Sequence, residues 1–185
     1  MFEELLAALG RELGKSGIPY MIIGGQAVLL HGEPRLTRDI DITLGAAPER
    51  LPDLLAVTHR LSLKPLVEDP KDFVERTMVL PTLEEGTGIR VDFIFSITPY
   101  EQQAIERGRK VIFERTEVNF ASVEDLVIHK IFSGRPVDLE DIKSVIRKNP
   151  NIDIDYVRKW LYEFQESVEG EAYSETFESL LRELE

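Results

Sequence analysis

Residues 24–26 read GGQ and residues 35–41 read RLTRDID, and the fold can be inferred from these two segments. The two glycines follow an apolar run at residues 20–23, which is too short for a helix and predicts a buried strand. A short helix is predicted over residues 27–31, directly after the glycines. Acidic residues then alternate with branched apolar ones, which predicts a strand over residues 39–44 with one apolar and one polar face.

Asp39 and Asp41 are two residues apart on that strand, so both carboxylates point to the same face. They can converge on one hard cation or bridge two. Mg²⁺ prefers oxygen ligands and is commonly held by one or two carboxylates together with substrate phosphates. Asp92 supplies a third carboxylate on a strand predicted over residues 89–97, with Asp92 on the side away from the core. Three acids on neighbouring strands suit a two-metal site, so we expect Mg²⁺ or Mn²⁺ there.

The glycine pair, Gly24 and Gly25, stands between a predicted strand and a predicted helix. Glycine permits a phosphate to approach the main chain closely, and a helix N-terminus supplies free N–H donors and a positive dipole end. A pair of glycines also occurs in many ordinary turns. The prediction of a phosphate site therefore depends on the acidic strand that follows, across a loop rich in Arg and Thr.

The order of the remaining elements indicates an α/β (α+β) fold. Helices are predicted over residues 2–15, 51–63 and 101–107, strands over residues 74–80 and 110–113, and helices over residues 122–132, 137–148, 153–166 and 174–184. We expect a mixed sheet flanked by helices over residues 1–120. A helical extension over residues 121–185 is expected to pack on that core.

The bulk composition excludes several classes of protein. The chain is 43% hydrophobic and 30% charged and has no cysteine, which rules out a disulfide framework and thiolate metal sites. No apolar run is long enough to span a bilayer, and the N-terminus lacks the basic start of a secretory signal, so we expect a cytoplasmic protein. The net charge of -12 argues against indiscriminate nucleic-acid binding. Residues 161–185 carry eight Glu and one Arg, so the acid is concentrated there and an RNA acceptor is not excluded.

The motifs together resemble the polymerase-β-like nucleotidyltransferases. The resemblance is carried by Gly24, Gly25, Arg35, Thr37, Asp39, Asp41 and Asp92. The spelling of residues 35–41 is similar to the branch that contains abortive-infection toxins of the AbiEii type. Residues 124–130 and 135–142 resemble the later helical motifs of that branch, which contain a Lys and an Asp.

The resemblance implies a nucleotidyltransferase fold and a reaction in which an acceptor attacks the α-phosphate of a nucleoside triphosphate and pyrophosphate leaves. It also implies two groups of site residues. The catalytic and metal-binding group is Asp39, Asp41 and Asp92, with Lys130 as a catalytic residue that approaches the triphosphate. The nucleotide-binding group is Gly24, Gly25, Gln26, Arg35, Thr37, Arg38 and Asp138.

Each candidate residue also has an ordinary structural interpretation. Asp39 and Asp41 could form a solvated strand face with nearby arginines as surface ion pairs, and Asp92 could be one more exposed strand carboxylate. A lysine such as Lys130 on an amphipathic helix usually faces solvent. Asp138 could occupy the first turn of a helix, where the dipole favours a carboxylate.

Three functions remain open from the sequence. The first is a metal-dependent nucleotidyltransferase that acts on RNA or protein, with a cognate partner of the toxin–antitoxin kind. The second is a nucleotide-binding or interaction module that kept the fold and lost turnover; three intact carboxylates favour the first over this one. The third is a transferase that modifies a small molecule such as an antibiotic.

Overall fold

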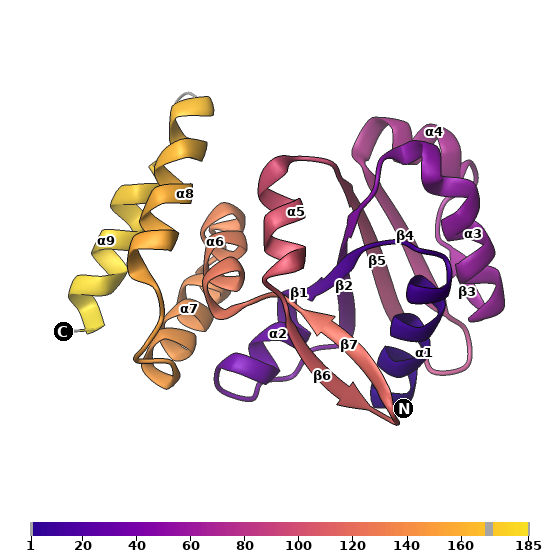
Figure 1. Ribbon diagram of the computed structural model, residues 1–185, viewed down its shortest axis with the longest axis horizontal. Helices are drawn as coiled ribbons and strands as arrows, with labels where there is room; N and C mark the ends of the chain where they lie inside the picture. Colours follow the sequence, from indigo (N-terminus) through magenta and orange to yellow (C-terminus); the bar gives the residue numbers. More distant parts are fainter. Residues whose placement is uncertain (1, 169–171, 185) are drawn as a thin grey trace. The chain divides into compact units, whose positions relative to one another are not determined.

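The computed structural model describes residues 2–168 and 172–184 (Figure 1). The chain divides into two compact units. The sheet unit comprises Met1–Gln26 and Leu36–Ala121, and the helical unit comprises Ala27–Arg35 and Ser122–Glu185. No helix within the described ranges is long and apolar enough to cross a membrane.

The sheet unit is built on one mixed sheet of seven strands in the order β3-β4-β5-β2-β1-β7-β6. The strands are β1 (Tyr20–Ile23), β2 (Asp39–Gly45), β3 (Leu63–Pro65), β4 (Val79–Glu84), β5 (Ile89–Ser96), β6 (Arg109–Phe113) and β7 (Thr116–Phe120). β2 pairs in parallel with β5, and β1 with β7, while the other neighbours are antiparallel. The fold is therefore the expected α/β arrangement with a mixed sheet.

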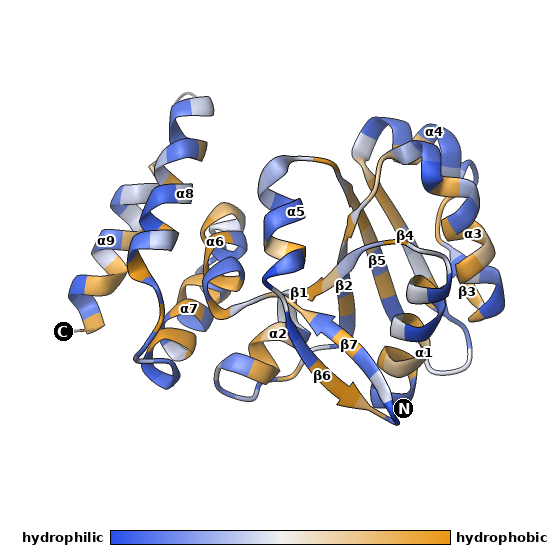
Figure 2. Ribbon diagram, viewed as in Figure 1, coloured by the Kyte–Doolittle hydropathy of each residue, from blue (hydrophilic) through white to orange (hydrophobic). Residues whose placement is uncertain are grey.

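Side chains along β5 alternate between a buried face and a more exposed face of the sheet. Val91, Phe93 and Phe95 are buried, whereas Arg90 and Asp92 lie on the opposite face with more solvent contact. This confirms the predicted orientation of that strand. β1 has all four of its residues buried and is mostly hydrophobic in Figure 2, as expected of a strand inside the sheet.

Helices of the sheet unit pack on this sheet. They are α1 (Phe2–Lys15), α3 (Leu51–Arg60), α4 (Pro70–Thr77) and α5 (Pro99–Glu106), with a single 3₁₀ turn, η1 (Pro48–Arg50), before α3. α1 packs against β7 and β6, and α5 packs against β2 and β1. The helix α2 (Gly24–His31) begins at the glycine pair itself, three residues earlier than the sequence indicated.

The predicted strand over residues 74–80 is wrong in its first half. Residues 70–77 form α4, and β4 begins only at Val79. The Asp69 side chain accepts hydrogen bonds from two main-chain N–H groups of the first turn, and Pro70 occupies its first position, which together start a helix. Met78 then ends the helix in the left-handed conformation.

The strand β7 was not predicted. It forms a hairpin with β6, in which Phe113 pairs with Thr116 across the two-residue turn Glu114-Arg115. Both turn residues have positive φ, 45° and 68°. Such turns are usually signalled by Asn-Gly or Asp-Gly, and Glu-Arg gives no such signal.

Replacing this turn by Glu114→Asn together with Arg115→Gly is expected to stabilise the chain. Asn and Gly adopt positive φ with little strain, whereas other residues lose about 1 kcal/mol or more in that region. We expect the free energy of unfolding to rise by about 1 kcal/mol, measured as a higher urea midpoint at unchanged slope. A lower midpoint would contradict the assignment of a strained turn.

The helical unit contains α6 (Val123–Ser133), α7 (Pro136–Lys148), α8 (Ile154–Ser167) and α9 (Tyr173–Leu184), close to the four predicted helices. α6 packs against α7 and α8, and α8 packs against α9. The ring of Phe132 meets the rings of Phe164 and Tyr173 edge-on, with centroids 4.7 and 4.9 Å away. Aromatic packing therefore joins α6, α8 and α9.

Candidate active site

The three predicted metal-binding carboxylates lie on one face of two neighbouring strands. In the parallel pair β2–β5, Asp41 lies opposite Asp92 and Asp39 lies opposite Arg90. Opposed residues of adjacent strands share a face, as do residues two apart on one strand. Asp39 is exposed, and Asp41 and Asp92 are half-buried. The register thus brings together carboxylates from distant parts of the sequence.

The glycine pair lies against this face at the end of β1. Ile23 is opposite Asp41 in the β1–β2 register, so Gly24 follows directly beside that carboxylate. A Cβ atom on Gly24 would lie 1.9 Å from Oδ2 of Asp41, and Gly24 has a φ of 61°. A Cβ atom on Gly25 would lie 2.3 Å from Oγ1 of Thr37. A side chain at either position would force Asp41 or Thr37 to shift, so glycine here leaves main chain rather than side chain beside the acid.

Two further predicted residues of the sheet unit lie beside Asp39. The buried Gln26 donates a hydrogen bond from Nε2 to the main-chain oxygen of Asp39, at 3.4 Å. Arg38 is exposed and directly precedes Asp39 in the chain. The Gln26 bond ties the first turn of α2 to the start of β2, so the glycine turn and the acidic strand are held together.

Arg90 is a site residue that the sequence analysis missed. Its Nε donates a hydrogen bond of 2.8 Å to Oδ1 of Asp92. This bond raises the pKa of Arg90, and the negative charges of Asp92, Asp39 and Asp41 act in the same direction. The spacing of Arg90 and Asp92, two residues apart on a predicted strand, was the available signal that they share a face.

The chemistry of this donor set fits a divalent cation. Carboxylate oxygens are the ligands that Mg²⁺ and Mn²⁺ favour, and three are presented from adjacent strands beside a glycine turn that leaves room for phosphate. As the side chains lie, no three acidic or imidazole groups within residues 2–168 and 172–184 are gathered closely enough to hold a metal ion. An oxygen of Asp92 is also hydrogen-bonded to Arg90.

The other predicted residues form a buried ion network in the helical unit. Nζ of Lys130 lies 2.5 Å from Oδ1 of Asp138 and 2.8 Å from Oδ2 of Asp141. Arg35 donates from Nε and one terminal nitrogen to the two oxygens of Asp141, at 2.8 and 2.9 Å. Arg135 pairs with Asp138 at 2.6 Å. The structure therefore brings Lys130, Arg35 and Asp138 together, and adds Asp141 and Arg135.

Lys130 and its acidic partners are among the most enclosed charges described. The side chains of Lys130 and Asp138 are 5% and 0% exposed. Burial opposes the ionisation of Asp138, but hydrogen bonds from Arg135, Lys130 and Ser133 outweigh it and lower its pKa to about 2. Asp138 is consequently ionised at neutral pH, and the amine of Lys130 on α6 pairs with two acids of α7.

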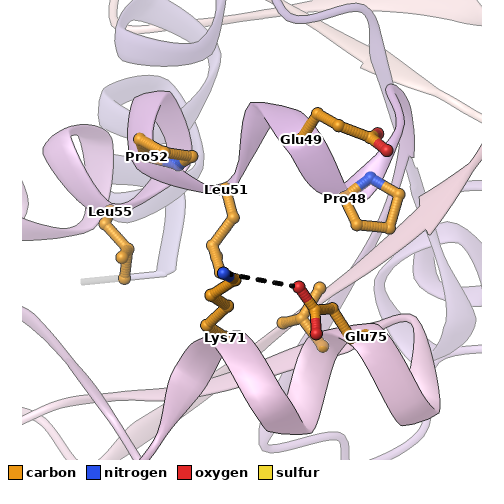
Figure 3. Close-up of a pocket in the computed structure, with 8 residues that line it drawn as sticks. Pro48, Glu49, Leu51, Pro52, Leu55, Lys71 and Glu75 are labelled. Carbon is orange, nitrogen blue, oxygen red and sulfur yellow. Dashed lines mark ion pairs between the residues drawn. The ribbon is translucent and has the colours of Figure 1, made fainter.

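The sheet unit also contains a separate cavity with a volume of about 510 Å³. Figure 3 shows the residues that line it. Its wall is mostly apolar and comes from η1, α3 and α4, with Lys71 and Glu75 paired at 3.9 Å on its rim. The lining residues are Pro48, Glu49, Leu51, Pro52, Leu55, Lys71, Val74 and Glu75. None of them belongs to the candidate site.

Comparisons with known proteins find similarity to nucleotidyltransferases. A family model described as "Nucleotidyltransferase of unknown function (DUF6036)" matches residues 99–183. The solution structure of the antibiotic-resistance factor ANT(2'')-Ia is similar, with 16% identity and a TM-score of 0.60 over 89% of this chain and 91% of that chain. No curated protein sequence matches the chain.

Two further solved structures show the same likeness. One is an antigenic nucleotidyltransferase-like protein from Paracoccidioides brasiliensis, with 18% identity and a TM-score of 0.54 over 89% of this chain and 88% of that chain. The other is a putative nucleotidyltransferase from H. pylori, with 14% identity and a TM-score of 0.50 over 98% of this chain and 94% of that chain. The chain therefore has the fold of the nucleotidyltransferases.

Proposed function

We propose that this chain is a metal-dependent nucleotidyltransferase that transfers a nucleoside monophosphate from a nucleoside triphosphate to an acceptor. The observation that carries the proposal is the register of β2 and β5, which sets Asp39, Asp41 and Asp92 on one face with the glycine pair against Asp41. An ordinary solvated strand would not need glycine at that contact. The matching family model and the fold support the same class.

In the sheet unit, one group of residues would bind the metal ions and another would bind the phosphates. Asp39, Asp41 and Asp92 would hold the divalent cations, which neutralise phosphate charge when bound. Gly24 and Gly25 leave the main chain open, so that N–H groups of the first turn of α2 can donate to phosphate oxygens. Thr37 and Gln26 flank that turn.

In the transfer step, the acceptor oxygen forms a bond to the α-phosphorus, and the bond from that phosphorus to the bridging oxygen of the β-phosphate breaks. Pyrophosphate leaves, and Asp92 accepts the proton of the acceptor hydroxyl as general base. Arg35, Arg38, Lys130 and Asp138 are proposed, from the family resemblance alone, to contact the nucleotide.

Two acceptor classes follow from two different observations. The likeness of residues 35–41 to the AbiEii-type branch favours RNA or protein, with a cognate toxin–antitoxin partner. The fold of ANT(2'')-Ia, also solved in complex with adenylyl-2''-tobramycin, favours a small molecule. A third outcome, a silent nucleotide-binding module, is favoured by the hydrogen bond that already engages Asp92.

Label transfer from α-labelled ATP, GTP, CTP and UTP distinguishes these outcomes. The purified chain is offered total RNA, a cell protein extract and a small-molecule pool, with Mg²⁺ or Mn²⁺. Asp41→Asn tests the site, and Asp72→Asn makes the same chemical change on the exposed face of α4. We expect label in one pool, lost in Asp41→Asn and kept in Asp72→Asn.

Two other results would change the conclusion. Metal-dependent nucleotide binding without transfer, abolished by Asp41→Asn, would indicate the silent module. Neither binding nor transfer by the unaltered chain would show that the metal-site interpretation is wrong.

A further inference from the structure

Arg90 supplies a positive charge beside the carboxylates whose negative charge a metal ion would otherwise neutralise. It precedes Asp92 by two residues on β5, and its partner across the strand pair is Asp39. Its guanidinium is bonded to Asp92 at 2.8 Å and experiences the charges of Asp39 and Asp41 as well. A fixed cation therefore lies among the three acids.

A metal ion and this guanidinium compete for the same oxygen atoms. A carboxylate has a limited set of lone pairs, and a hydrogen bond from Arg uses those that face the donor. The competition is mild because the pair is partly in water: the side chain of Arg90 is 48% exposed and that of Asp92 is 19% exposed. Ion pairs of this exposure contribute little to stability, so a divalent cation can displace the guanidinium from the carboxylate.

We propose that Arg90 is a built-in counter-ion that holds Asp92 before metal loading and is displaced from it when a divalent cation binds. This inference rests on the proposed function, because it takes Asp39, Asp41 and Asp92 as the metal ligands. It means that the metal binds weakly by itself and well together with a nucleotide, whose phosphates add oxygen ligands. Arg90 would thereby couple metal loading to the arrival of substrate.

Binding of Mn²⁺ alone, followed by electron paramagnetic resonance of the free ion, tests the proposal. The metal-free chain is compared with Arg90→Gln, with Asp41→Asn, and with Arg76→Gln. Arg76 lies on α4 of the same unit and is 68% exposed, so this variant controls for the loss of one positive charge. We expect Arg90→Gln to bind Mn²⁺ about five- to tenfold more tightly, since an exposed ion pair no longer has to be broken. Arg76→Gln is expected to match the unaltered chain.

The possible failures are distinguishable. Unchanged or weaker Mn²⁺ binding in Arg90→Gln, with binding still lost in Asp41→Asn, would overturn the role of Arg90 and leave the proposed function intact. Equal tightening in Arg76→Gln would reduce the effect to general charge and also overturn it. No Mn²⁺ binding by either the unaltered chain or Arg90→Gln would remove both the inference and the metal site beneath it.

A second measurement follows the guanidinium directly. The Nε–H signal of Arg90, assigned by its absence in Arg90→Gln, is recorded by nuclear magnetic resonance with and without diamagnetic Mg²⁺ and a non-hydrolysable nucleotide. Displacement predicts a shift of this signal and faster exchange with solvent once the hydrogen bond to Asp92 is broken. A signal that stays unchanged at saturating Mg²⁺ and nucleotide would contradict displacement.

Discussion

Gly24→Ala is expected to reduce nucleotidyl transfer by at least about a hundredfold while leaving the sheet folded. The new methyl group would lie 1.9 Å from Oδ2 of Asp41, so this carboxylate has to move away from its neighbours. A displacement of about 1 Å in a catalytic group can cost a factor of about 10². The positive φ of Gly24 adds strain of about 1–2 kcal/mol, which we expect to appear as a lower melting temperature.

Gly14→Ala is the matched control for this change. Gly14 lies on α1, and apart from its chain neighbours and the backbone of its own helix a Cβ atom there meets nothing within 4 Å. Alanine in a helix is more favourable than glycine by about 1 kcal/mol, so this variant should retain full transfer and gain stability. Transfer by Gly24→Ala at the rate of the unaltered chain would mean that the contact between Gly24 and Asp41 plays no part in catalysis.

Lys130→Met is expected to lower the free energy of unfolding by about 3 kcal/mol. Methionine has a similar length, but it leaves Asp138 and Asp141 without the cation that joins them inside the helical unit. Breaking a buried ion pair by removing one partner costs about 3–5 kcal/mol. Arg135 and Arg35 each still hold one of the acids, which places the expected cost at the lower end of that range.

The dependence of stability on pH distinguishes a stability loss caused by breaking the ion network from one caused by poorer packing of the new side chain. Asp138 has its pKa lowered from 3.8 to about 2, so its contribution is present above about pH 4 and is lost as the pH falls towards 2. In Lys130→Met one of the hydrogen bonds that lower this pKa is gone, and acid unfolding should begin at higher pH. Urea titrations across this range measure the effect. Lys159→Met, at a side chain 61% exposed, should change stability by less than about 1 kcal/mol.

Much of the fold follows from local patterns in the sequence. The hydrophobic spacing of the sequence predicts helix α1 and strands β1, β2 and β5, and each forms as predicted. The error at residues 74–77 arose because the β-branched Val74 and Thr77 lead directly into a real strand, while the start of α4 depends on a cap at Asp69. The hairpin at Glu114 was missed because its turn geometry is imposed by strand pairing rather than by its own residues.

The candidate site was less accessible to the same reasoning. Spacing alone places Asp39 and Asp41 on one face, but their meeting with Asp92 depends on which strands are neighbours and in which register. The spacing of Arg90 and Asp92 likewise places them on one face but does not determine that the two side chains form a hydrogen bond. The contact between Lys130 and Asp141 depends on how two helices, α6 and α7, pack against each other, which local sequence patterns do not specify.

The parallel pairing of β2 with β5 also has a consequence for synthesis of the chain. Parallel neighbours need a crossover, and here residues 46–88 emerge from the ribosome between the two strands. A nascent chain that ends before β5 carries Asp39 and Asp41 but lacks both Asp92 and Arg90. The acidic strand then has neither Asp92 nor Arg90 beside it, so the proposed metal site cannot be complete until β5 has been translated and added to the sheet.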